Sequence, residues 1–275
     1  MVDAALEFLL RRDRYVVLAA LLALTALAWA YLFWLVGNMT MQSPDIIMSG
    51  MAMPGMVMDP KLTHAPLWPQ ELLLAFTMWA IMMVGMMTPS VAPVILLYAR
   101  VGRQAVSSGK PFAATGWFAA GYFLAWTVFS LLAASAQVAL RSATLLTPML
   151  EPASPLLGGA ILVIAGVYQW SRLKNAWLVQ CWEPLGFIQR LGGFKRTVAG
   201  SLTLGFRHGI YCIGCCWAFM FLLFVGGVMN LLWVAGLAVL VLLEKFSAQG
   251  RFLSRATGAV LIAGGLLLIY RGGMG

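Results

Sequence analysis

Charged residues are scarce in this sequence, and their scarcity excludes a water-soluble globular protein. Asp, Glu, Lys and Arg together make up 10% of the 275 residues, against about 25% in typical soluble domains. Hydrophobic residues make up 62%, so too few polar side chains remain to cover a surface in water. The sequence therefore predicts a protein whose surroundings are largely lipid.

Cysteine and acidic residues are also few. The chain has four cysteines, three of which fall within residues 212–216, and this uneven placement excludes a disulfide framework. Nine acidic against eighteen basic residues leave a formal net charge of +9, whose meaning depends on where the charges lie. Methionine, in contrast, is abundant. Membrane residence alone does not account for seventeen methionines.

Long apolar stretches predict an all-α, polytopic bundle of about seven transmembrane helices. A spanning helix needs about 20 mostly apolar residues. The expected spans are residues 15–36, 72–98, 112–140, 156–170, two within an uncharged run at 209–243, and 256–270. The uncharged run is slightly short for two spans, so the fifth helix is expected to start near residues 197–200 and to turn at Gly226-Gly227 with Asn230.

The distribution of Lys and Arg predicts the orientation. If the N-terminus is cytoplasmic, fifteen of the eighteen basic residues lie on the cytoplasmic side, and only Lys61, Arg141 and Arg271 lie outside. This asymmetry follows the positive-inside rule, so the net charge is a topology signal and indicates no nucleic-acid partner. We expect a multi-pass protein of the bacterial inner membrane, in contact with lipid, with a periplasmic C-terminus.

Three parts follow from this layout. Residues 1–37 form a cytoplasmic tail and the first helix, residues 38–70 form a Met-rich periplasmic segment, and residues 71–275 form the remaining membrane bundle. The periplasmic segment is punctuated by proline and glycine and has no packed core to receive its methionines. Those that are expected to bind metal are Met39, Met41, Met51, Met53, Met56 and Met58.

Thioether sulfur is a soft, uncharged ligand that favours Cu(I) and tolerates an oxidising compartment. The periplasmic methionines therefore indicate copper capture. The alternative is that these methionines form an apolar segment that lies on the membrane surface. Asp45, Asp59 and His64 supply harder ligands in the same segment.

The second helix carries a ladder of methionines. Met78, Met82 and Met86 recur every four residues, and Met83 and Met87 repeat the spacing one residue later. Such spacing keeps sulfur atoms near one face, over a rise of about 12 Å from residue 78 to residue 86. Metal ligation and plain core packing both fit this pattern. Pro89 and Pro93 predict a kink beyond the ladder.

The fifth helix strengthens the metal hypothesis. His208, Cys212, Cys216 and Met220 are spaced by four, and Cys215 lies beside that face. Polar groups inside a membrane are functional candidates because burying them unpaired is costly. We expect His208 and the three thiols to ligate a soft metal, although structural cysteines and redox thiols remain alternatives.

The position of this cluster predicts contact between the two helices. The second and fifth helices are expected to meet at similar depth, with Gly85 and Gly214 permitting close approach. Glu244 and Lys245 are interpreted as an anchor at the inner surface.

Several motifs together resemble a known family. They are residues 78–89 (MWAIMMVGMMTP), 208–217 (HGIYCIGCCW), 227–231 (GVMNL) and Glu244-Lys245. In these motifs the chain is similar to a bacterial family of uncharacterised integral membrane proteins described as predicted metal-binding. The resemblance implies a helical membrane fold with a metal site, and it implies no particular activity.

The leading interpretation is a copper-handling membrane protein that captures Cu(I) with periplasmic methionines and binds it in the membrane for transport, storage or delivery. Its expected partners are a periplasmic copper chaperone or a membrane cuproenzyme complex. A second interpretation is a thiol oxidoreductase that uses Cys212 and Cys215, although an enzyme is the less favoured class. A third is an accessory subunit of a copper oxidase or monooxygenase complex.

Overall fold

The structure is a computed structural model that describes residues 2–49, 68–109, 115–147, 150, 152–247 and 249–273. Within these residues the regular secondary structure is helical, apart from one isolated bridge between Leu146 and Pro152. The helices are α1 (Val2–Ser49), α2 (Trp68–Ser107), α3 (Thr115–Ser142), α4 (Pro155–Gln169), α5 (Arg172–Trp182), α6 (Pro184–Arg190), α7 (Val198–Val225), α8 (Leu231–Phe246) and α9 (Gly250–Gly272).

Five of these helices, α1, α2, α3, α7 and α9, are long and apolar enough to cross a membrane. Helices α4 and α5 form a sixth candidate that is bent by 63° at residues 170–171. Helix α8 has 16 residues, which is shorter than the roughly 20 of a complete span. The all-α expectation is confirmed, and each of the seven expected spans corresponds to a helix. However, α4 belongs to the bent α4–α5 pair, and α8 is shorter than a complete span.

Helix ends follow the sequence signals closely around α7 and α8. The Thr197 side chain accepts a hydrogen bond from the Gly200 backbone at the start of α7, as the predicted start requires. Helix α7 ends at Val225, Gly227 has a φ of +81°, and the Asn230 side chain caps α8 by accepting from the Trp233 backbone N–H. Near the start of the chain, α1 continues to Ser49, so the backbone of residues 38–49 in the predicted periplasmic segment is helical.

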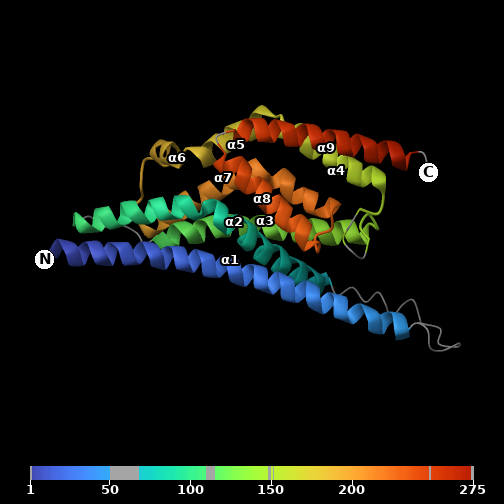
Figure 1. Cartoon of the computed structure of the whole chain (residues 1–275), viewed down its shortest axis with the longest axis horizontal. Helices are drawn as coiled ribbons and strands as arrows, with labels where there is room; N and C mark the ends of the chain where they lie inside the picture. The colour runs from blue at the N-terminus through green and yellow to red at the C-terminus, as the bar shows by residue number, and fades with distance from the viewer. Residues whose placement is uncertain are drawn as a thin grey trace.

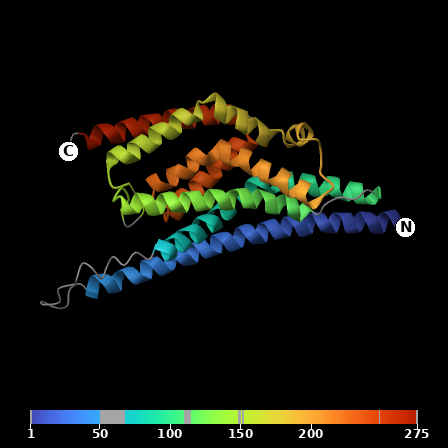
Figure 2. The ribbon, with the colours of Figure 1, turned by 180° about the vertical axis from the view of Figure 1, so that it is seen from behind.

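The helices form a layered bundle (Figure 1). Helix α1 lies beside α2 along one edge, α9 lies beside α4 along the opposite edge, and α3, α7 and α8 lie between them, as the view from behind also shows (Figure 2). The two chain ends lie at opposite ends of the bundle, and α2 changes direction partway along its length, where Pro89 and Pro93 fall inside the helix.

Polarity is inverted relative to a soluble protein. Large apolar side chains are exposed, among them Leu232 (87% exposed) and Val260 (71%), whereas Lys174, His208 and Glu244 are buried. Exposed apolar faces of this extent fit a lipid environment, and ionisable groups buried within it are candidates for function.

Glycines bring α3 and α7 into backbone contact. A Cβ atom on Gly121 would lie 2.0 Å from the carbonyl oxygen of Leu202, and one on Gly205 would lie 2.0 Å from that of Phe118. No side chain fits at either position, so the two helices approach as closely as their backbones allow. This contact places α3 directly against the part of α7 that carries His208 and Cys212.

The glycines expected to join α2 and α7 have other neighbours. Gly85 packs against Ala28 and Trp29 of α1, and Gly214 packs against Trp177 of α5. Helices α2 and α7 meet through larger side chains instead. The Tyr98 hydroxyl lies 2.6 Å from Ser201 Oγ near one end, and the Trp79 and Phe224 rings lie 5.3 Å apart near the other.

Candidate metal centre

A cavity of 530 Å³ lies where α2, α3, α7 and α8 meet the α5–α6 segment. Its lining includes one imidazole, two thiols, one ammonium group, one phenol and two hydroxyls. The lining residues are Ser90, Pro93, Val94, Tyr122, Cys181, Trp182, Pro184, His208, Cys212, Lys245, Phe246 and Ser247. The cavity is thus rich in groups that are expensive to bury unless they have a partner or a ligand.

Cys212 is the centre of a polar network in this cavity. Its Sγ lies 3.0 Å from the Tyr122 hydroxyl and accepts a hydrogen bond from Lys245 Nζ at 2.8 Å. Lys245 Nζ also donates to Ser90 Oγ at 3.1 Å. No carboxylate pairs with Lys245 among the described residues, so the buried ammonium group depends on sulfur and hydroxyl partners.

The other three cysteines connect to the same network. Cys181 Sγ on α5 lies 3.8 Å from Cys215 Sγ on α7. The thiols of Cys215 and Cys216 donate to the backbone carbonyl of Cys212, at 3.0 and 2.8 Å. All four cysteines of the chain therefore lie in one connected group, which spans two helices.

His208 lies in an aromatic pocket one turn before Cys212. Its ring centroid is 5.2 Å from that of Phe187, 5.9 Å from Tyr122 and 6.0 Å from Phe118. The side chain is 3% exposed, and Nδ1 has no hydrogen-bond partner within the described residues. An unpartnered buried nitrogen beside a cavity is a free position for a metal or another ligand.

A second buried charge cluster lies beside the thiols. Lys174 Nζ donates to both carboxylate oxygens of Glu244 at 2.7 Å and also contacts Gln169 Oε1. The Ser254 hydroxyl donates to Gln169 as well, so α4, α5, α8 and α9 meet at this ion pair. The interpretation of Glu244 and Lys245 as a surface anchor is therefore wrong, since both side chains point into the protein.

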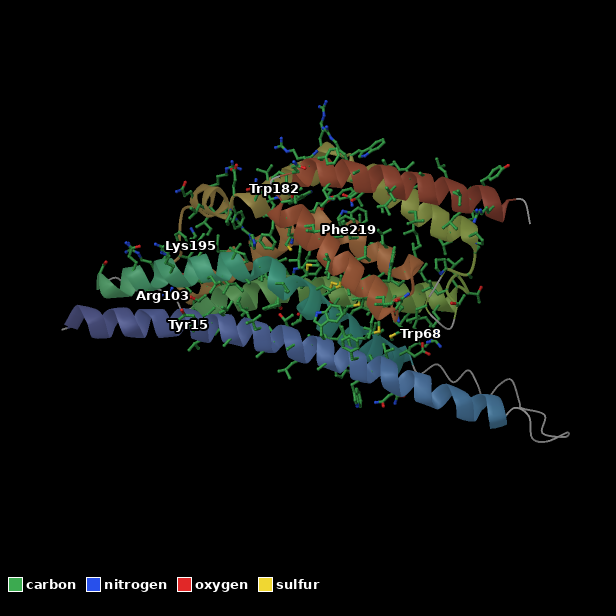
Figure 3. All side chains as sticks on the ribbon, in the orientation of Figure 1. Tyr15, Trp68, Arg103, Trp182, Lys195 and Phe219 are labelled. Atoms are coloured by element: carbon green, nitrogen blue, oxygen red, sulfur yellow. The ribbon has the colours of Figure 1, made fainter. Side chains whose placement is uncertain are left out.

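The methionine ladder on α2 is buried in full. Met78 is 6% exposed, and Met82, Met83, Met86 and Met87 are at most 1% exposed. Burial fits core packing and metal ligation equally, so it does not distinguish them. Figure 3 shows sulfur atoms in a line through the middle of the bundle toward the end at which Trp68 lies.

Met87 connects the ladder to the thiols. Its Sδ lies 4.0 Å from Ser90 Oγ, which in turn accepts from Lys245, the partner of Cys212. The expected ligand face was that of Met78, Met82 and Met86, so the methionine with the most direct link to the cavity belongs to the neighbouring face.

The predicted ligand set is gathered only in part. No group of three or more His, Cys, Asp or Glu side chains in the described part of the chain is placed to hold an ion together. The thiols of Cys212 and Cys215 have different side-chain partners, Lys245 for Cys212 and Cys181 for Cys215. The side chains of the six predicted periplasmic methionine ligands lie outside the described residues.

Comparison with known proteins supplies the deciding observation. Residues 76–268, about 70% of the chain, match the model of a family described as PpoB2, copper chaperone. The chain belongs to this copper chaperone family. No curated protein and no solved structure matches it at a significant level.

Membership of a copper chaperone family confirms the general expectation of copper handling, and the donors at the cavity suit copper as cargo. Thiol and thioether sulfur are soft donors that select Cu(I), and imidazole is a common copper ligand. The Cys181 and Cys215 thiols are two such soft donors, 3.8 Å apart.

Sequence reasoning did not predict the contacts of three residues at this site. Cys181 and Tyr122 lie 34 and 90 residues from their cysteine partners on α7, so no local spacing links them. Lys245 follows Glu244 near a helix end and so resembles an interfacial anchor. The Glu244-Lys245 motif could have indicated its buried contacts, because two adjacent opposite charges in an apolar helix suggest that each side chain has its own buried partner.

Proposed function

We propose that this protein is an integral membrane copper chaperone of the bacterial inner membrane that binds Cu(I) at its buried thiols and passes it to an acceptor. The observation that carries the proposal is that Cys181, Cys212 and His208 line one cavity, with Cys215 and Cys216 in contact with these cysteines, in a chain of a copper chaperone family. In this proposal the N-terminus is cytoplasmic, in agreement with the positive-inside rule.

Charge supports a monovalent soft cation as cargo. A complex of Cu(I) with two thiolates carries one negative charge, which is costly to bury alone. Lys245 Nζ, 2.8 Å from Cys212 Sγ, supplies the opposite charge in a region of low dielectric constant. A complex of two thiolates with a divalent ion is already neutral, so the same lysine disfavours divalent cargo.

The methionines supply an entry route in this proposal. The predicted capture segment, residues 39–58, precedes α2 in the chain, and α2 begins at the Trp68 end of the bundle (Figure 3). From there the ladder leads inward to Met87, which reaches Cys212 through Ser90 and Lys245. Weak, exchangeable thioether sites along this line suit movement of Cu(I) toward the stronger thiols.

The test is the copper content of the protein purified under reducing conditions after loading with Cu(I). We expect stoichiometric copper in the wild type, little in the Cys212→Ser, Cys215→Ser double variant, and slower loading when residues 39–58 are removed. Met229→Leu, which changes a methionine outside the ladder and the thiol group, is the matched control and is expected to load like the wild type. Absence of copper from the reduced wild type contradicts the proposal.

One observation favours a second candidate, a membrane dithiol oxidoreductase. Cys181 and Cys215 place their sulfur atoms 3.8 Å apart, close enough to form a disulfide after a small movement. Oxidation of the two thiols releases two protons and two electrons, and a membrane quinone is an acceptor for both. Quinone reduction that disappears in Cys181→Ser and Cys215→Ser supports this activity, whereas reduction that persists in both variants excludes it.

A further inference from the structure

Cys181 differs from the other three cysteines in its accessibility. Cys212, Cys215 and Cys216 are 1–2% exposed, whereas Cys181 is only half-buried. Cys181 also comes from α5 and not from α7, and it lines the cavity while its partner Cys215 does not. The pair therefore joins a fully enclosed sulfur atom to one that a partner molecule can approach.

The cavity lining includes four residues that are not fully buried, Trp182, Pro184, Phe246 and Ser247, and these residues define its mouth. The guanidinium carbon of Arg251 lies 5.8 Å from the centre of the Trp182 ring, as is typical of a membrane–water boundary where aromatic and cationic groups meet. His208, Cys212 and Lys245 form the buried part of the lining, the inner wall.

This mouth lies in a definite half of the bundle. The cavity is lined by the later half of α2, the earlier half of α7 and the end of α8. Arg103, near the end of α2, and Lys195, just before α7, lie at the same end of the bundle (Figure 3). Trp68, where α2 begins, lies at the opposite end.

We propose that Cys181 is the exit ligand, which takes Cu(I) from Cys215 and passes it through this mouth to an acceptor that presents sulfur ligands. The inference rests on the proposed function and adds a direction to it, since copper leaves at the Arg103 and Lys195 end, opposite to the Trp68 end at which α2 begins.

The transfer is a ligand exchange without redox change. One Cu–S bond to the protein breaks as each Cu–S bond to the acceptor forms. The acceptor thiol loses its proton when it binds copper, and the protein cysteine that is released takes up a proton. Cu(I) remains Cu(I) throughout, so no oxidant or reductant is needed.

The experiment measures the rate at which the Cu(I)-loaded protein gives up copper to bathocuproine disulfonate, a hydrophilic Cu(I) chelator. We expect Cys181→Ser to keep wild-type copper content and to transfer copper at least about tenfold more slowly, a rate change equal to about 1.4 kcal/mol in the barrier. Cys181→Met keeps a soft sulfur donor and is expected to restore most of the rate, which a purely structural role does not predict.

Sidedness is tested with a hydrophilic maleimide on intact cells and on inverted membrane vesicles. We expect copper-free Cys181 to react in inverted vesicles only, and copper loading to protect it. Wild-type transfer rates in both Cys181 variants overturn the exit role. Loss of bound copper from Cys181→Ser also overturns it, because Cys181 is then a ligand that holds the copper. Reaction from the outer side overturns the direction. If the wild type binds no copper, the proposed function itself is rejected. If Cys181→Ser fails to fold, the maleimide reaction and the transfer rate of Cys181→Met test the exit role instead.

Discussion

Replacing Gly205 with alanine probes how strictly the α3–α7 contact positions the thiols. The new Cβ would lie 2.0 Å from the Phe118 carbonyl oxygen, and ordinary van der Waals contact begins at 3.4 Å, so the backbones must separate by about 1.4 Å. The Tyr122 hydroxyl lies on α3 and Cys212 Sγ on α7, 3.0 Å apart. Separation on this scale breaks their hydrogen bond and widens the inner wall of the cavity.

The energetic cost follows from the same geometry. Overpacking of a tight contact costs about 1–3 kcal/mol, and the higher helix propensity of alanine returns about 0.5–1 kcal/mol. We expect Gly205→Ala to be destabilised by about 1–2 kcal/mol, with a lower thermal unfolding midpoint in detergent and weaker Cu(I) retention in a chelator titration.

Gly236→Ala is the matched control for this substitution. Gly236 lies within α8, and nothing lies within 4 Å of the position of its Cβ, so alanine there is expected to be neutral or mildly stabilising. If both Gly205→Ala and Gly236→Ala have the unfolding midpoint and the copper retention of the wild type, the close approach of α3 and α7 does not position the site.

Three further predictions concern charge and capture. Lys245→Met removes the ammonium group beside Cys212 and is expected to lower Cu(I) affinity about 10–100-fold in competition titrations, whereas unchanged affinity refutes the charge argument. Lys174→Met leaves Glu244 buried without its partner and is expected to cost about 3–5 kcal/mol in thermal unfolding, and adding Glu244→Gln should recover part of the loss. Removal of residues 39–58 is expected to slow copper accumulation by cells without lowering the final copper content of the purified protein, and an unchanged uptake rate removes the capture role.

The positions of the helices, and the residues that share one face of α7, could be predicted from the sequence because both depend on local patterns. Apolar runs of sufficient length predict spans, Thr197 and Asn230 are ordinary capping residues, and spacing by four places His208 and Cys212 on one face. These properties depend on residues a few positions apart, so a single sequence contains them.

Contacts at the site between residues that lie far apart in the chain could not be predicted in this way. The chain bends by 63° between α4 and α5, and this bend lets α5 fold back so that Cys181 meets Cys215. Gly121 and Gly205 bring α3 and α7 together, whereas Gly85 and Gly214, which depth alone suggested as a contact, have other neighbours. Such pairings depend on the shapes of surfaces that meet only in the folded protein.

X-ray absorption spectroscopy at the copper edge tests the central claim most directly, because it reports the oxidation state and the atoms bound to the metal. For the reduced, copper-loaded wild type we expect Cu(I) bound mainly by sulfur at a low coordination number, and loss of that sulfur signal in the Cys212→Ser, Cys215→Ser double variant. Copper bound only by nitrogen and oxygen, or a sulfur signal unchanged in the double variant, contradicts a copper site at the buried thiols.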